Sequence, residues 1–281
     1  MGLWSVTRPF VAFDACSVSV ALIVRRPGRA HVEGFARVPL EPGALVPSPA
    51  GANLVRPDEV AEALARALRT LERTPDRATL VLPDGVARLA PLDVPSGAEP
   101  RDYARFRLAS SLPWPASEGT FEVLRLGRRA VGAAIRRATV ARYEQLASAA
   151  GLSVDQVHLA PLLAVQGLLA RGRGRRDALH VVLGDMALCL VLVREGEMLA
   201  FRSRRRDPGD DEARWLRSEA ERATRAVPET NGGFDIVVSG SGAEELRGAL
   251  GASVLSADFT PEGSAEWPDA AEAGWIVGAL A

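Results

Sequence analysis

The two halves of this chain open with the same sequence pattern. Residues 11–24 and residues 180–193 each place a short polar turn between two apolar runs. Apolar, β-branched runs on either side of a small turn are typical of a β-hairpin. A third turn of small residues, 239–243, follows the β-branched run 236–238 and precedes a helical pattern. The repeat predicts a two-lobed α/β protein, and the cleft between two lobes is the usual place for a ligand.

The charge, the cysteines and the histidines argue against a nucleic-acid partner, a disulfide framework and a histidine-based metal site. The net charge is −1 over 281 residues, and all 34 basic residues are arginine, so we expect no nucleic-acid partner. Cys16 and Cys189 both lie in apolar strand patterns, as reduced thiols of a cytoplasmic protein do. The histidines His31, His158 and His180 are scattered without the spacing of metal ligands, so we expect no metal site built on them.

Neither a secretory signal nor a membrane-spanning segment is expected. The first nine residues lack the long apolar core of a signal peptide. No stretch reaches the roughly 18 consecutive apolar residues that a membrane helix needs. We therefore expect a cytoplasmic protein that meets a membrane only through partners.

The first half reads as one lobe, 1–170, with a small α+β insertion at about 95–138. The lobe begins β-β-β-α-β, an order that favours a sheet with helices against it. Asp58 is the expected cap of the first helix. Its expected strands are 10–13, 18–24, 31–38, 79–82 and 154–159, and its expected helices are 58–73, 139–150 and 161–170. The insertion is expected to hold a helix over 100–111 and a hairpin over 121–126 and 130–135.

The second half repeats this order after a glycine- and arginine-rich linker at 171–178. Its lobe is expected to span 179–281 and to end in a helix around Trp275. The expected strands are 180–184, 187–193, 197–203 and 236–238, and the expected helices are 211–226 and 243–250. The repeated element order indicates an internal duplication.

Four segments carry a resemblance to a known family. Segment 13–17 stands where that family has a phosphate loop, and 105–115 resembles its helix ending in a proline pair. Segment 142–157 resembles a helix before an Ala-Gly-Leu element, and 239–243 resembles an adenosine loop. Together they resemble the PilM family of type IV pilus assembly proteins, within the actin-like ATPase superfamily. The cytoplasmic part of GspL from type II secretion is similar. The resemblance implies a duplicated actin-like, ribonuclease H-like α/β fold.

The resemblance also implies a nucleotide site for ATP and magnesium in the cleft, but four positions depart from the family pattern. Cys16 replaces a glycine of the first loop, Ala21 replaces a lysine, Val182 stands where the alignment expects an aspartate, and Ser241 replaces a glycine of the third loop. Because glycine lets the backbone approach a phosphate, these departures predict a degenerate site without catalysis. If the site is retained, the residues that would hold nucleotide are Asp14, Cys16, Ser17, Gly184, Asp185, Ser239, Gly240, Ser241 and Gly242.

Several of these residues have a structural explanation as well as a functional one. Asp14 either positions a magnesium-bound water or bonds to its own turn. Gly240 and Gly242 either pass beneath an adenine ring or make a strand-to-helix turn. Trp114, between two prolines, either anchors a partner peptide or holds the insertion against the lobe.

The function that the resemblance implies is that of a scaffold. Proteins of this family bind the short cytoplasmic tail of a PilN-type bitopic membrane protein, in a groove beside the inserted subdomain. They thereby couple an inner-membrane platform to the motor ATPase, so the chain is expected at the periphery of the inner membrane. Three alternatives stay open: a GspL-like secretion component, an active ATPase or sugar-kinase relative, and a cell-division protein resembling FtsA.

Overall fold

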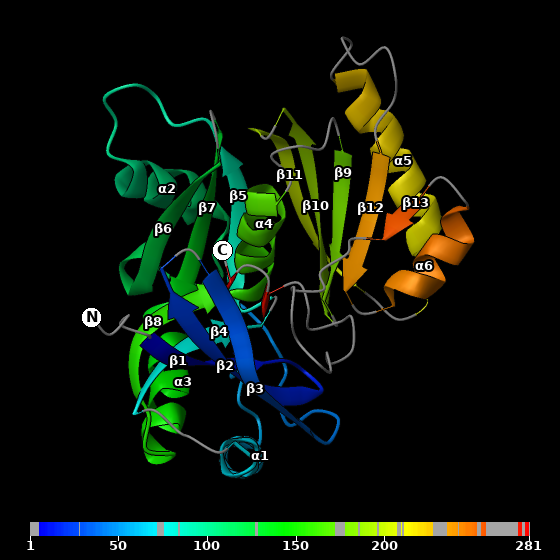
Figure 1. The fold of residues 1–281 in the computed structure, drawn as a ribbon. Coiled ribbons are helices and arrows are strands. Elements are labelled where there is room, and N and C mark those ends of the chain that lie inside the picture. The colour runs from blue at the N-terminus through cyan, green and yellow to red at the C-terminus, as the bar shows by residue number, and fades with distance from the viewer. Residues whose placement is uncertain are drawn as a thin grey trace.

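The computed structural model contains two five-stranded sheets, a three-stranded sheet and the helices that cover them (Figure 1). Residues 172–177 of the expected linker lie outside the part of the chain that the structure describes. That part comprises 6–27, 29–71, 76–83, 85–126, 129–171, 178–184, 186–195, 197–206, 209, 211–226, 235–240, 242–251, 254–256, 275–276 and 279–280.

The sheet of the first lobe has the strand order β3-β2-β1-β4-β8. Strand β2 is antiparallel to both of its neighbours, β1 and β3, whereas β4 is parallel to both β1 and β8. The strand bounds are β1 (Val6–Phe13), β2 (Ser17–Arg26), β3 (Arg29–Pro39), β4 (Arg77–Leu82) and β8 (Ser153–Leu159). All five expected strands are thus present. Buried residues follow one another without alternation in β1, β2 and β4, because both faces of a covered sheet are shielded from water.

Helices α1 (Pro57–Arg69) and α3 (Arg137–Ala149) cover one face of this sheet. Val60, Leu64 and Leu68 of α1 recur every four residues and are buried against the strands. The expected cap is wrong, because Arg56 occupies the N-cap position and Asp58 lies inside the first turn. In the first turn its carboxylate still interacts favourably with the positive end of the helix dipole.

The opposite face of the first sheet is covered by residues from far along the chain. Helix α4 (Ala160–Arg171) contributes Leu163, and the C-terminal residues Trp275, Ile276 and Ala279 join the same apolar cluster. Arg25 of β2 also donates a hydrogen bond of 2.6 Å to the carbonyl oxygen of Ala279. The end of the chain therefore packs on the first lobe, whereas we expected it to close the second.

The second lobe repeats the first, with the strand order β11-β10-β9-β12-β13. Its strands are β9 (Ala178–Leu183), β10 (Ala187–Arg194), β11 (Glu197–Arg205), β12 (Asp235–Gly240) and β13 (Val254–Ser256). Helices α5 (Glu212–Ala226) and α6 (Ala243–Leu250) cover one face. The shared strand order confirms the duplication, and β13 is a strand that the sequence pattern did not predict.

The insertion is a three-stranded antiparallel sheet with the order β5-β7-β6, covered by helix α2 (Pro100–Leu108). Strands β6 (Gly119–Leu126) and β7 (Arg129–Arg136) form the expected hairpin. Strand β5 (Ala87–Leu92) was not expected, and it places the start of the inserted sheet before residue 95. Pro91 within β5 is tolerated because β5 is an edge strand.

Helix α4 lies between the two large sheets (Figure 1). Its Leu163 packs on the first sheet, whereas Ala164 and Val165 pack on the second, beside Val191 of β10. Residues of the insertion, including Val131, join this second cluster. One short apolar helix thereby ties both lobes and the insertion together.

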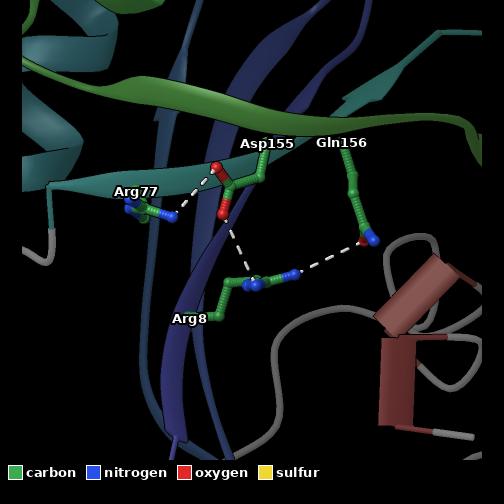
Figure 2. Close-up of polar contacts among 4 residues, drawn as sticks. All are labelled: Arg8, Arg77, Asp155 and Gln156. Atoms are coloured by element: carbon green, nitrogen blue, oxygen red, sulfur yellow. Dashed lines mark hydrogen bonds and ion pairs between the residues drawn. The ribbon is translucent and has the colours of Figure 1, made fainter.

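A bulge gathers polar side chains on the first sheet (Figure 2). The β4–β8 register shifts between Ala78 and Thr79, so Asp155 is an extra residue in β8. Figure 2 shows Asp155 and Gln156 both reaching toward Arg8 of β1, with contacts of 3.5 Å each. These exposed contacts contribute little to stability.

In the part of the chain that the structure describes, no helix combines the length and apolarity needed to cross a bilayer.

We predict that Trp275→Ala destabilises the protein. The side chain is 7% exposed in the cluster that covers the first sheet, so its loss leaves a cavity. The expected loss in the free energy of unfolding is about 3–5 kcal/mol, measured by urea denaturation. Phe106→Ala is the matched control, because Phe106 is 77% exposed and its loss should change stability by less than about 0.5 kcal/mol. Equal effects of the two variants would contradict this packing of the C-terminal residues.

Candidate functional site

The turns that open the two lobes have the same hydrogen-bonded geometry. In the first, the N–H of Asp14 donates to the carbonyl oxygen of Ser17 at 2.9 Å; in the second, Gly184 donates to Ala187 at 2.8 Å. The turns lie between paired residues of β1–β2 and β9–β10, namely Phe13 with Val18 and Leu183 with Leu188. The two turns are therefore equivalent residue by residue.

A second pair of hydrogen bonds fixes the same equivalence. Leu40, just after β3, donates its N–H to the carbonyl oxygen of Cys16 at 2.8 Å. Arg206, just after β11, donates its N–H to the carbonyl oxygen of Met186 at 3.0 Å. Cys16 thus corresponds to Met186, and the backbone of each is held by the chain that follows the third strand of its lobe.

This equivalence corrects the alignment of the second turn. We expected Val182 at the position of the second aspartate, but Val182 lies inside β9, and Gly184 is the residue equivalent to Asp14. Asp185 is outside the described residues, and its place in the sequence corresponds to Ala15. An acid at the first position of the turn is therefore present in the first lobe and missing in the second.

Both turns carry a side chain at their third position. Cys16 is exposed, and its Sγ accepts a hydrogen bond from Arg37 at 3.7 Å. Met186 is half-buried and lines a cavity. A glycine at these positions would leave the backbone N–H groups open to a phosphate, so the residues present do not fit a phosphate loop of that kind.

The other polar groups of the first turn are used locally or are shielded. The Oδ1 of Asp14 accepts a hydrogen bond from the N–H of Ala15 at 2.7 Å, as aspartates in turns commonly do. The hydroxyl of Ser17 is buried and has no hydrogen-bond partner among the described residues. Neither the hydrogen bond of Asp14 nor the buried hydroxyl of Ser17 distinguishes a ligand-binding turn from an ordinary one.

The third turn is shaped by close packing of the backbone. Gly240 has a φ of +97°, and a Cβ added there would lie 1.9 Å from the carbonyl oxygen of Leu183. Ser239 is buried and donates its hydroxyl to the carbonyl oxygen of Val181 at 3.2 Å. Gly242, with a φ of +78°, is the N-cap residue of α6, and Ser241 is outside the described residues. Gly240 is thus required by the β9–β12 pairing itself.

An ion pair lies between the second and third turns. The guanidinium of Arg206 donates to the carbonyl oxygen of Gly184 at 2.5 Å and to both carboxylate oxygens of Glu212 at 2.6 and 3.1 Å. Its Nη2 lies 3.5 Å from the Cβ position of Gly242. The pairing of Arg206 with Glu212 is a local one, between residues six apart in the chain, as the acids that follow the arginine run 202–206 lead one to expect; the hydrogen bond to Gly184 depends on tertiary contact.

A cavity of about 280 Å³ lies where both lobes meet the insertion. Pro47 and Pro49 of the β3–α1 loop line it, together with Leu89 of β5, Pro161 of α4 and Met186. Arg88, Arg204 and Arg205 also line it, although the guanidinium of Arg204 lies over the ring of Trp215, and no acidic residue is among the described lining residues. A groove beside the insertion is what the family resemblance implies, but no local sequence pattern predicts which residues line it, because its walls are distant in the chain.

Trp114 holds the insertion in place. Its side chain is only 7% exposed, and its Nε1 donates to the carbonyl oxygen of Pro49 at 2.8 Å. The ring packs on Phe121 and over Gly119, where a Cβ would lie 2.5 Å from it. Of the two interpretations of Trp114, the buried contact fits the structural one, and the side chain is not exposed to a partner.

Among the described residues, no group of three or more histidine, cysteine or acidic side chains could hold a metal ion.

We predict that Gly240→Ala strongly destabilises the protein. The Cβ would collide with a backbone oxygen, and the positive φ adds strain. The expected loss in unfolding free energy is at least about 2 kcal/mol by urea denaturation. The control is Gly248→Ala, on the open surface of α6, which should stabilise by up to about 1 kcal/mol. A tolerated Gly240→Ala would contradict the close approach of β12 to β9.

Comparison with known proteins shows the fold. No protein-family model and no curated protein matches the sequence. A PilM–PilN type IV pilus biogenesis complex is similar over 90% of this chain and 88% of that chain, at 19% identity and a TM-score of 0.68. An actin-like ATPase-fold protein of unknown function from Bacteroides thetaiotaomicron covers 87% and 86%, at 9% identity and a TM-score of 0.57. The cytoplasmic domain of EpsL, an inner-membrane component of type II secretion in Vibrio cholerae, covers 98% and 94%, at 14% identity and a TM-score of 0.55. The chain thus has an actin-like fold, built from two lobes of equivalent topology.

Proposed function

We propose that this protein is a cytoplasmic scaffold that binds the tail of a PilN-type membrane protein at the inner-membrane platform of a type IV pilus. The observation that carries the proposal is the similarity to the PilM–PilN complex over 90% of the chain, at a TM-score of 0.68. The fold alone does not determine a function, so the proposal also depends on a suitable binding surface.

The cavity beside the insertion is the proposed place for the tail. Its apolar walls include Leu89, Leu159 and several prolines, which suit apolar side chains of an extended peptide. Arg88 and Arg205 carry donors suited to carbonyl or carboxylate oxygens. Because the walls come from both lobes and the insertion, a bound segment would also reinforce their arrangement.

The proposal assigns no catalytic step to the cleft. Cys16 and Met186 stand at the positions where glycine would admit a phosphate, and the acid of the first turn has no equivalent at Gly184. The Arg206–Glu212 pair also occupies space between the second and third turns. We infer that ATP with magnesium binds poorly and is not hydrolysed.

A secretion role is the second candidate. The cytoplasmic domain of EpsL is similar over 98% of this chain, so the same scaffold could serve a type II secretion platform. The two roles differ in which membrane protein supplies the tail. In both, the scaffold reaches the inner membrane by binding that protein. In both the pilus and the secretion version of the proposal, the scaffold also contacts the cytoplasmic motor ATPase.

We predict that the purified protein binds the cytoplasmic tail peptide of the PilN-type protein encoded beside it. The expected dissociation constant is micromolar by isothermal titration calorimetry, and ATP with magnesium should leave it unchanged. Ala87→Trp should weaken binding by about tenfold or more, because the indole would fill the cavity. Ser117→Trp, on an exposed site of the insertion outside the cavity, is the control. Binding unaffected by Ala87→Trp would place the tail elsewhere, and no binding by the folded protein would contradict the scaffold proposal.

We also predict that glycine at the third turn positions raises the affinity for ATP. The double variant Cys16→Gly/Met186→Gly should bind a fluorescent ATP analogue with magnesium about tenfold more tightly, because two sets of backbone N–H groups become accessible. Ala98→Gly, in the loop before α2, is the control for added backbone freedom. Unchanged affinity in the double variant would show that these two side chains are not what closes the site.

A further inference from the structure

The cavity beside β5 is bounded by the edges of two sheets. Strand β5 is the outermost strand of the inserted sheet and β11 that of the second lobe's sheet, and Figure 1 shows the two strands next to each other. Residues 87–89 of β5 and 203–205 of β11 all line the cavity. Successive side chains of a strand point to opposite faces of its sheet, so three consecutive lining residues place the cavity along the edge of each strand.

Pro91 determines which backbone groups of β5 point to this free edge. It is paired with a residue of β7 but has no N–H, so the pair has no hydrogen bonds and the proline nitrogen is directed away from β7. Antiparallel pairs alternate between the hydrogen-bonded and the non-hydrogen-bonded kind. Arg88 and Ala90 therefore bond to β7, whereas the N–H and C=O groups of Ala87 and Leu89 point outward.

These outward backbone groups are available for pairing. In the part of the chain that the structure describes, neither Ala87 nor Leu89 has a hydrogen bond outside the ladder of its own sheet. Both residues line the cavity, so their backbone donors and acceptors lie at its margin. An unpaired strand edge is a template for an extended segment, which adds to the sheet through main-chain hydrogen bonds.

The edge of β11 is less suited to an added strand than the edge of β5. Arg202, Arg204 and Arg205 place charged side chains along β11, and charges on an edge strand disfavour the addition of another strand. The stretch 87–90 of β5 carries one arginine and three apolar residues. The edge of β5 is therefore the one that fits a further strand, and Pro91 limits the pairing to the residues before it.

We propose that the tail of the membrane protein binds as an added strand on β5 and extends the inserted sheet to the order tail-β5-β7-β6. The binding mode rests on the proposed function and specifies the kind of segment that the cavity accepts, an extended one whose alternate N–H groups are free to pair. The outward groups of Ala87 and Leu89 form the new hydrogen bonds. Because side chains of a strand alternate, every second side chain of the tail faces the apolar wall that contains Leu159 and Pro161.

Amide hydrogen exchange, measured by NMR on the full-length protein with and without the tail peptide, tests this pairing. In the free protein the amides of Arg88 and Ala90 should exchange slowly and those of Ala87 and Leu89 quickly, because only the first two donate to β7. At saturating peptide, exchange at Ala87 and Leu89 should slow by about tenfold or more. Exchange at residues 203–205 of β11 should not change.

A second measurement varies only the peptide. Methylation of one backbone nitrogen of the tail at a time removes a donor and blocks the close approach of another strand. The affinity, measured by calorimetry, should fall by about tenfold or more at alternate residues and stay within about twofold at the residues between them. A helical segment, or one held only by its side chains, would show no such period of two.

A proline variant of β5 tests the same bonds from the side of the protein. Ala87→Pro should weaken binding by about tenfold, because proline removes an outward N–H and leaves the bonds to β7 in place. Arg125→Pro is the matched control and should leave binding unchanged. Residues of β7 bond alternately to β5 and β6, so the N–H of Arg125 points outward at the opposite edge of the same sheet. Urea denaturation checks that both variants fold.

Each outcome decides the proposal. Slowed exchange at Ala87 and Leu89, together with the alternating effect of methylation, supports the added strand. If the unmodified peptide binds but either effect is absent, the added strand is wrong and the scaffold proposal stands. Protection of residues 203–205 in place of Ala87 and Leu89 also overturns it, because the tail then pairs with β11. No binding of the unmodified peptide by the folded protein overturns both the added strand and the proposed function.

Discussion

The packing of α4 between the two large sheets is the contact on which the rest of the arrangement depends. Leu163 faces the first sheet while Ala164 and Val165 face the second, so neither lobe covers its own inner face without this helix. Trp275, Ile276 and Ala279 complete the cover of the first sheet, so residues from the end of the second half pack on the first lobe. Burial of these apolar surfaces, which is the main favourable term in folding, therefore couples the two lobes.

Duplication preserved the backbone of the two turns while their side chains diverged. The hydrogen bonds of 2.9 and 2.8 Å that close the turns are equivalent, yet Asp14 and Cys16 correspond to Gly184 and Met186. Backbone hydrogen bonds are obligatory for any strand-turn-strand unit, whereas the identity of the side chains matters only for a ligand. Beside the second turn, Arg206 donates to the carbonyl oxygen of Gly184 and pairs with Glu212.

The β3–α1 loop connects the insertion with two cavities. Its Pro49 carbonyl accepts the hydrogen bond from Trp114, so the indole fixes the loop and the inserted sheet to each other. The loop lines the cavity beside β5 with residues 47–49 and a second cavity, at the start of α3, with residues 50–54. The hydrogen bond from Trp114 thus anchors a loop that lines both cavities, although each cavity has its own walls.

The sequence by itself determined the local elements and their repeated order. Periodic apolar residues, as in Val60, Leu64 and Leu68, and paired β-branched runs specify helices and hairpins through short-range contacts. The sequence pattern did not predict edge strand β5, which contains a proline and alternates weakly. This strand is stabilised by pairing with β7, which lies far away in the chain. Only the tertiary structure decided that Gly240 serves strand packing, that Trp114 is buried, and that Arg206 donates a hydrogen bond to the carbonyl oxygen of Gly184. Those facts depend on contacts between residues far apart in sequence, which a local pattern does not encode.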